Sequence, residues 1–184
     1  IADQWSEFEN NIFNDRIETF TILTQEDADL LNDLGPSFIR SLSINCFNCT
    51  VVLPSIERIH FLSISGGWSE FPNLEHAYNI YYSGSNYNNM AARENNRFYA
   101  PNLTDVDHHL HLYRLADLDL TSLQHVGVID DILHYGGIST YYGQLLIKHT
   151  YLTEIALPSL IFVRREAYFE YNYYMTSISI PTST

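Results

Sequence analysis

Apolar and polar residues recur along this chain in one short pattern. A heptapeptide with apolar residues at its first, fourth and seventh positions returns five times, as LPSIERI (53–59), FPNLEHA (71–77), APNLTDV (100–106), LTSLQHV (120–126) and LPSLIFV (157–163). After each copy comes a stretch of alternating character, at 61–65, 78–82, 109–113, 131–135 and 168–172. Period-2 alternation with β-branched and aromatic residues is typical of strands, so the pattern predicts a mainly β protein.

The repeat also predicts which side chains form the core. One unit cannot bury its own apolar face, whereas stacked units share a continuous core. We therefore expect the fourth and seventh residues of each copy to point inward. The fourth residues are Ile56, Leu74, Leu103, Leu123 and Leu160, and the seventh are Ile59, Ala77, Val106, Val126 and Val163. The sixth residues, Arg58, His76, Asp105, His125 and Phe162, are expected to form one exposed column.

These features predict one domain over 1–184, a right-handed β-solenoid of the leucine-rich-repeat-like kind. Residues 37–184 would form irregular repeats of about 20 residues, with insertions at 83–99 and roughly 136–144 at the corners. A β-sandwich with similar turns is the alternative architecture.

Residues 1–36 predict a helical cap for one end of this core. Thr24-Gln25-Glu26-Asp27 has the form of a capping box, and Gly35-Pro36 is a stop signal. Apolar residues at roughly helical intervals upstream, from Trp5 to Phe20, predict that the helical cap extends towards the N-terminus.

The last turn of the repeat is incomplete in this sequence. TEIALPSL (153–160) aligns with TSISIPTS (176–183), so a new turn has begun at Thr184. We expect either that the natural chain continues beyond Thr184, or that this end is covered by another molecule, including a second copy of the chain.

The run TFTILTQEDADLLNDLG (19–35), the strand-like IRSLSI (39–44) and the LPSL-type turns resemble the receptor L-domain-like β-helices. Within that group the chain is similar to fungal cell-wall and cell-surface proteins of the sporulation-specific and GPI-anchored wall-integrity type, over residues 19–184. The resemblance implies a secreted or wall-attached, glycosylated, non-enzymatic protein. Family members carry cysteines near the positions of Phe20 and Leu34, whereas this chain has them at 46 and 49.

Charge restricts the choice of partners. The net charge is −13, with 22 acidic and 9 basic residues, and this field repels phosphate backbones and anionic lipid head groups. We expect no nucleic-acid partner, and no membrane insertion by this segment because it has no long uncharged apolar run. The sequons at Asn48 and Asn102 predict glycosylation and an extracellular, cell-wall or cell-surface location.

The cysteines and histidines offer weaker candidate chemistry. Cys46 and Cys49 are expected to form a tight structural disulfide or to remain inert thiols, since no second cysteine pair completes a zinc site. His109 and His111 share one strand face and could contact a metal at two points. However, the simpler interpretation places both histidines and Tyr113 in an outward polar row, with Leu110 and Leu112 inward. The sequence thus predicts no metal site and no cofactor.

An enzyme is the third hypothesis for function. Parallel β-helices can carry carboxylate pairs for polysaccharide cleavage. The candidates are Asp105 with Asp107, Asp117 with Asp119, and Asp130 with Asp131. Such pairs are also expected on the solvated face of an acidic chain, so we expect no catalytic residues.

Tyrosine is the residue type that best indicates a function, with 14 in the chain. Exposed tyrosine suits the stacking of sugar rings or a protein contact. The predicted binding residues are Tyr81, Tyr82, Tyr168, Tyr171, Tyr173 and Tyr174. The sequence therefore predicts a structural or recognition protein that binds a cell-wall glycan or a surface protein. The alternative is a secreted effector or receptor-like ectodomain that binds a host or mating partner.

Overall fold

The computed structural model describes residues 16–84, 94–127 and 143–181. The predicted strand at 131–135, most of both insertions and the Asp130–Asp131 pair lie outside these residues.

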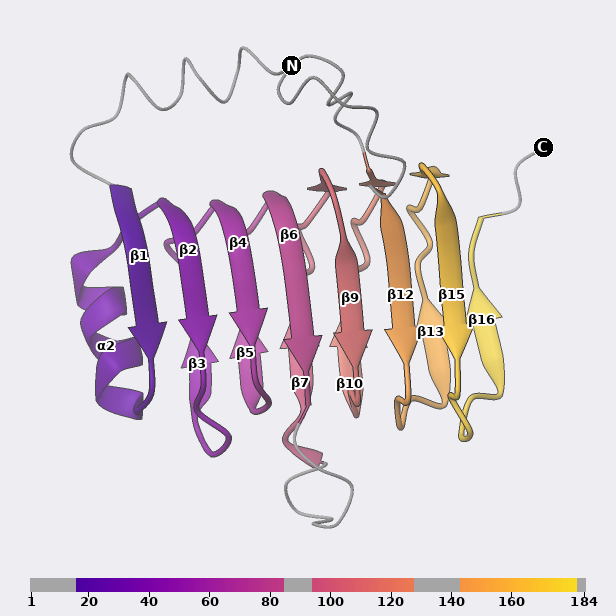
Figure 1. Ribbon diagram of the computed structural model, residues 1–184, viewed down its shortest axis with the longest axis horizontal. Helices are drawn as coiled ribbons and strands as arrows, with labels where there is room; N and C mark the ends of the chain where they lie inside the picture. The colour runs from indigo at the N-terminus through magenta and orange to yellow at the C-terminus, as the bar shows by residue number, and fades with distance from the viewer. Residues whose placement is uncertain (1–15, 85–93, 128–142, 182–184) are drawn as a thin grey trace.

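The described strands are all parallel and lie mainly in two layers (Figure 1). The large sheet contains ten strands: β1 (Arg16–Ile22), β2 (Phe38–Ile44), β4 (Arg58–Ile64), β6 (His76–Ser83), β8 (Asp105–Val106), β9 (Leu110–Tyr113), β11 (His125–Val126), β12 (Gln144–Lys148), β14 (Phe162–Val163) and β15 (Glu166–Glu170). The four-stranded sheet contains β3 (Thr50–Val52), β5 (Trp68–Glu70), β7 (Arg97–Tyr99) and β10 (Asp117–Asp119). β13 (Glu154–Ala156) pairs with β16 (Ser177–Ser179).

The predicted right-handed β-solenoid is wrong for this structure. The described strands form separate parallel sheets that are largely planar, the largest with ten strands, together with one short helix. Alternation along the sequence identifies the buried side of a strand, and a repeat identifies equivalent positions. Neither encodes the backbone angles between strands, which decide whether the sheets wind into coils or extend as flat layers.

The predicted inward positions are largely confirmed. The fourth residues of all five repeat copies are buried in one core cluster, and so are the seventh residues of the first four copies; Val163 is only half-buried. Because equivalent residues of neighbouring strands pair one to one, as Ile59 does with Ala77 and Ala77 with Val106, their side chains stack in rows through the core. The single-domain assignment over 1–184 stays a prediction.

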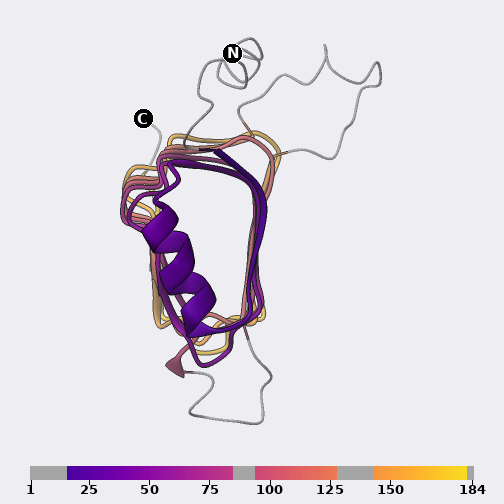
Figure 2. The same cartoon turned by 90° about the vertical axis from the view of Figure 1, so that its left-hand side faces the viewer.

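One helix, α2 (Gln25–Leu34), lies at the β1 end of the layers (Figure 2). Thr24 and Asp27 form the predicted capping box, Gly35 ends the helix in the left-handed conformation, and Ala28 and Leu31 are buried in the core. The helical extension is wrong for residues 16–22, which form β1 in register with β2. The apolar and β-branched residues of RIETFTI are compatible with the periodicity of a strand as well as with that of a helix. Pairing with β2 favours the strand.

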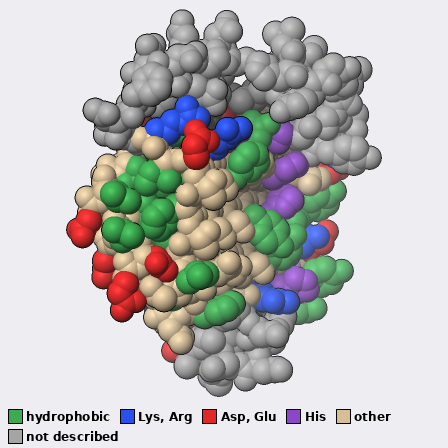
Figure 3. All heavy atoms as spheres, turned by 60° about the vertical axis from the view of Figure 1, so that its left-hand side comes forward, with side chains coloured by type: hydrophobic (Ala, Val, Ile, Leu, Met, Phe, Trp, Pro, Cys, Tyr) green, Lys and Arg blue, Asp and Glu red, His purple; other side chains and the backbone are tan. Residues whose placement is uncertain are grey.

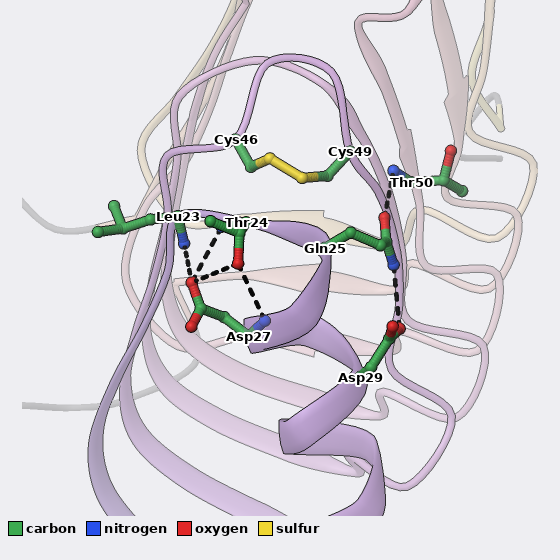
Figure 4. The surroundings of a disulfide bond; sticks show 8 residues. All are labelled: Leu23, Thr24, Gln25, Asp27, Asp29, Cys46, Cys49 and Thr50. Carbon is green, nitrogen blue, oxygen red and sulfur yellow. Dashed lines mark hydrogen bonds between the residues drawn. A yellow bond between two sulfur atoms is a disulfide. The ribbon is translucent and has the colours of Figure 1, made fainter.

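The cysteine pair is a disulfide beside the start of α2 (Figure 4). Cys46 and Cys49 close the turn between β2 and β3, and the Thr50 amide next to them donates to Gln25 Oε1 at 3.3 Å. Gly67 passes so close that an added Cβ would lie 2.6 Å from the Cys46 carbonyl oxygen, at a φ of +83°. The residues described include no helix of the length and apolar character that a membrane crossing needs.

Candidate binding face on the large sheet

Histidines concentrate on one surface of the large sheet. Of the eight in the chain, six lie on or beside β4, β6, β9 and β11: His60, His76, His108, His109, His111 and His125. His108 is buried and the other five are half-buried. Figure 3 shows histidine side chains gathered in a strip next to apolar ones. We name this surface, with its aromatic neighbours Phe61, Tyr78, Tyr81, Tyr113 and Tyr168, the histidine–aromatic face.

The first row of this face is the predicted column of sixth repeat residues. Register pairs Arg58 with His76, His76 with Asp105, Asp105 with His125, and His125 with Phe162. The register confirms that these residues form one row, although only Phe162 in it is exposed and the other four are half-buried.

Asp105 lies between two histidines in this row. His76 Nδ1 lies 3.3 Å and His125 Nδ1 lies 2.7 Å from its carboxylate oxygens, and the Thr104 hydroxyl donates to it at 2.6 Å. Burial alone would raise the pKa of the Asp105 carboxyl, but the hydrogen bonds from His76, Thr104 and His125 hold that pKa well below its ordinary value. Because an ionised carboxylate only accepts, it orients both imidazoles with Nδ1–H inward and Nε2 available.

A second group of rings packs next to this row. Tyr78 stands between His60 and His108, with ring centroids 4.4 Å and 4.2 Å away, and its hydroxyl is 2.9 Å from His108 Nε2. Phe61 packs edge-on against Tyr78 at 5.5 Å. These contacts hold the rings in fixed orientations, because each is in contact on more than one side.

The third group runs along the other half of the face. Register aligns Tyr81 with His111, His111 with Leu146, and Leu146 with Tyr168. The Tyr81 and Tyr113 rings lie 5.7 Å apart. The Lys148 ammonium lies over the Tyr168 ring at 5.6 Å and pairs with Glu170 at 2.6 Å. The aromatic side chains of this group are tilted to one another, the Tyr81 and His111 rings by 63°, and Lys148 and Glu170 lie beside them.

Burial keeps the central histidines neutral. It lowers the pKa of His109 to about 4, helped by the neighbouring His111 and His108, and it lowers the pKa of His111 as well. As predicted, these side chains and Tyr113 face outward while Leu110 and Leu112 are buried. In the described part of the chain, no group of three or more histidine, cysteine or carboxylate side chains is placed to hold a metal ion.

The six predicted binding tyrosines separate into three environments. Tyr81 and Tyr168 share the outward row described above. Tyr82 was predicted to bind but is completely buried, and its hydroxyl donates to the Gly67 carbonyl at 2.7 Å. Two adjacent residues of a strand face opposite sides, and the sequence did not show which of the pair points inward.

The other three tyrosines lie in the turn after β15. Tyr171, Tyr173 and Tyr174 are exposed there. The Tyr171 ring stacks on His149 at 4.8 Å, and Tyr174 contacts Tyr151 at 6.0 Å. These three residues follow β15 in the chain and are not among the residues that define the histidine–aromatic face.

The remaining candidate residues are dispersed. Of the first predicted carboxylate pair, Asp107 is buried and Asp105 binds the two histidines. Of the second pair, Asp117 accepts a hydrogen bond from the Tyr99 hydroxyl within the four-stranded sheet. Asn48 and Asn102 are both exposed, as glycosylation requires, and the Asn102 amide also donates to the Pro72 carbonyl at 2.7 Å.

The sequence did not predict the contacts that Asp105 makes with His76 and His125, although their shared repeat position placed all three in one row.

Comparison with protein-family models, with curated proteins and with solved structures finds no match for this chain.

Proposed function

We propose that this chain is a non-enzymatic recognition protein of the cell surface or cell wall, and that its histidine–aromatic face binds a glycan. The observation that carries the proposal is the group of outward aromatic side chains on adjacent strands, Tyr81, His111 and Tyr113, with Tyr168 beyond Leu146 in the same row and Lys148 beside them. Sugar rings present an apolar face that stacks on such rings, and hydroxyls that pair with the bordering polar groups.

The geometry suits an extended ligand. Strand spacing repeats at about 4.8 Å along each row, which is comparable to the length of one sugar residue in an extended polysaccharide. A chain lying across the strands would therefore meet an equivalent position on each successive strand. Because each contact contributes on the order of 1 kcal/mol, affinity would depend on several of them together.

Two features support an extracellular location. The Cys46–Cys49 disulfide is a bond that persists in oxidising compartments, and both sequons have exposed asparagines. The resemblance to fungal wall proteins agrees with the same location, and a GPI-anchored or otherwise wall-attached glycoprotein is part of this proposal.

A glycan array that includes β-glucan, chitin and mannan fragments tests the proposal. We expect binding by the parent chain, with affinity lowered about tenfold in each of Tyr81→Ala and Tyr113→Ala. Phe47→Ala removes an exposed ring from the disulfide turn and is the matched control. The face would be the wrong site if Tyr173→Ala abolished binding while Tyr81→Ala and Tyr113→Ala bound normally.

A protein ligand is the second candidate, and the exposed Tyr171, Tyr173 and Tyr174 favour it. Blank glycan arrays, together with a cross-linked surface-protein partner lost on Tyr173→Ala, would support an effector or receptor-like ectodomain instead.

A further inference from the structure

The outward side of the large sheet continues from the histidine–aromatic face to β1. Figure 1 shows β1, β2, β4, β6 and β9 side by side in this order. On the first three of these strands, the outward positions are occupied mainly by small side chains with a hydroxyl group. We name them the hydroxyl patch: Thr19, Thr21, Ser41, Ser43 and Ser63.

One row of residues joins the hydroxyl patch to the aromatic side chains. Register pairs Thr21 with Ser43 and Ser43 with Ser63. It then pairs Ser63 with Tyr81 and Tyr81 with His111. Neighbouring strands lie about 4.8 Å apart, so the row extends for about 19 Å across five strands. Because the sheet is largely planar, the five positions follow a nearly straight line.

The side chains of this row are accessible to a ligand. Those on β1, β4 and β6 are exposed, and those on β2 and β9 are half-buried. Leu146, the next residue of the row, is buried, so the accessible part of the row ends at β9. In the described part of the chain, the hydroxyl groups of the patch form no hydrogen bond with another residue. They can therefore donate to and accept from the hydroxyl groups of a ligand.

The charges around the row favour an uncharged ligand. Glu18 and Arg40 pair with each other at 3.3 Å beside the hydroxyl patch, and Lys148 pairs with Glu170 at 2.6 Å beyond the aromatic end. Burial lowers the pKa of His111, so this side chain is neutral at neutral pH. An acidic or basic polysaccharide would gain little from groups that are neutral or already paired.

We propose that the hydroxyl patch and the aromatic side chains form one continuous site for an uncharged, unbranched β-1,4-linked polysaccharide that lies straight across β1, β2, β4, β6 and β9. This inference rests on the proposed glycan-binding function and names its substrate class. β-1,4 linkages between glucose-type sugars produce an extended ribbon, whereas β-1,3 linkages produce a coiled chain. The ribbon can follow a straight row of side chains, and the coil leaves it after a few sugars.

The two halves of the site contribute different contacts. An apolar sugar face stacks on Tyr81 at the aromatic end. Further along the same chain, sugar hydroxyls exchange hydrogen bonds with Ser63, Ser43 and Thr21. A disaccharide therefore occupies the aromatic end alone, and a longer oligosaccharide also reaches the hydroxyl patch.

Isothermal titration calorimetry with oligosaccharides of two to six sugars tests the inference. One series contains β-1,4-linked glucose and a second contains β-1,4-linked N-acetylglucosamine, which distinguishes cellulose-type from chitin-type ligands. In at least one series we expect affinity to rise with each added sugar and to level off at about five. That hexasaccharide should bind about tenfold more tightly than the β-1,3-linked glucose hexasaccharide.

Substitutions in the hydroxyl patch test the longer part of the site. Thr21→Lys and Ser43→Lys should each weaken binding of the hexasaccharide about tenfold and leave that of the disaccharide unchanged. Thr121→Lys is the matched control, because Thr121 is exposed in the turn between β10 and β11. Circular dichroism and melting temperature would establish that all three variants fold.

Two results would overturn this inference while leaving the proposed function intact. One is equal affinity for the β-1,3-linked and β-1,4-linked hexasaccharides, and the other is parental affinity of both hydroxyl-patch variants for the hexasaccharide, in each case with weaker binding by Tyr81→Ala. If no oligosaccharide bound, or if Tyr81→Ala bound all of them as the parent does, the proposed function and this inference would both be wrong.

Discussion

The buried hydroxyl of Tyr82 allows a one-atom test of the packing between the two layers. Tyr82 has no exposed surface, whereas its neighbour Tyr81 is 47% exposed. The Tyr82 hydroxyl donates to the Gly67 carbonyl at 2.7 Å, and its ring packs against Phe98 at 6.1 Å between centroids. Tyr82→Phe keeps the ring and removes only this hydrogen bond.

The expected cost is that of one buried hydrogen bond. Removing the Tyr82 hydroxyl leaves the buried Gly67 carbonyl without this hydrogen-bond donor, which lowers the free energy of unfolding by about 1 kcal/mol. For a chain of this size that corresponds to a fall in melting temperature of about 2–4 °C. Tyr82→Ala also removes the ring from the core and should cost about 3–5 kcal/mol.

Thermal and urea unfolding of Tyr82→Phe, with Tyr81→Phe as the matched control, provides the measurement. Tyr81→Phe should change stability little because its hydroxyl is on the outward side. Alkaline titration adds an independent check: burial raises the pKa of Tyr82, so an unfolded chain loses this proton at a lower pH than the folded one, and stability falls above about pH 10. The packing would be wrongly assigned if Tyr81→Phe lost stability and Tyr82→Phe did not.

The remaining predictions concern the core, the disulfide turn, the half-buried histidines and the sequons. Leu160→Asp buries a carboxylate in the core at a cost of several kcal/mol, so circular dichroism should show an unfolded chain, and a parental melting curve would contradict this. Gly67→Ala should cost about 1–3 kcal/mol, measured by urea unfolding, because a Cβ meets the Cys46 carbonyl at a positive φ. The pKa of His109 is about 4 in the folded chain and about 6.5 in the unfolded chain, so the free energy of unfolding should fall as the pH drops from 6.5 to 4. This fall should be less steep in His109→Gln. The same dependence of stability on pH in parent and variant would refute the assignment. Native protein from a secretory pathway should lose mass on deglycosylation, and Asn102→Gln should lose less.

The apolar pattern by itself determined the local structure and much of the core. The repeat placed Ile56, Leu74, Leu103 and Leu123 inward, and all four are buried. Each lies in the turn before a strand, where an apolar side chain leaves water as the turn packs onto the core. The two ends of α2 followed from Thr24 and Gly35, because each makes its capping contact with a residue only a few positions away along the chain. The Cys46–Cys49 bridge was one of two expected states of that turn, and a chain with two cysteines has no other pairing within it.

Tertiary structure alone decided the features that depend on the path of the chain between strands. The flat parallel sheets in place of a solenoid, the strand at 16–22 in place of a helix, and the inward turn of Tyr82 all depend on pairing partners and backbone angles. The hydrogen bonds of Asp105 with His76 and His125 join residues 20 and more positions apart, so no local pattern could specify them. Whether a residue is buried depends mainly on its own apolar character and its spacing along the chain. A binding face depends on the distances between side chains of different strands, and these distances are set only when the sheets assemble.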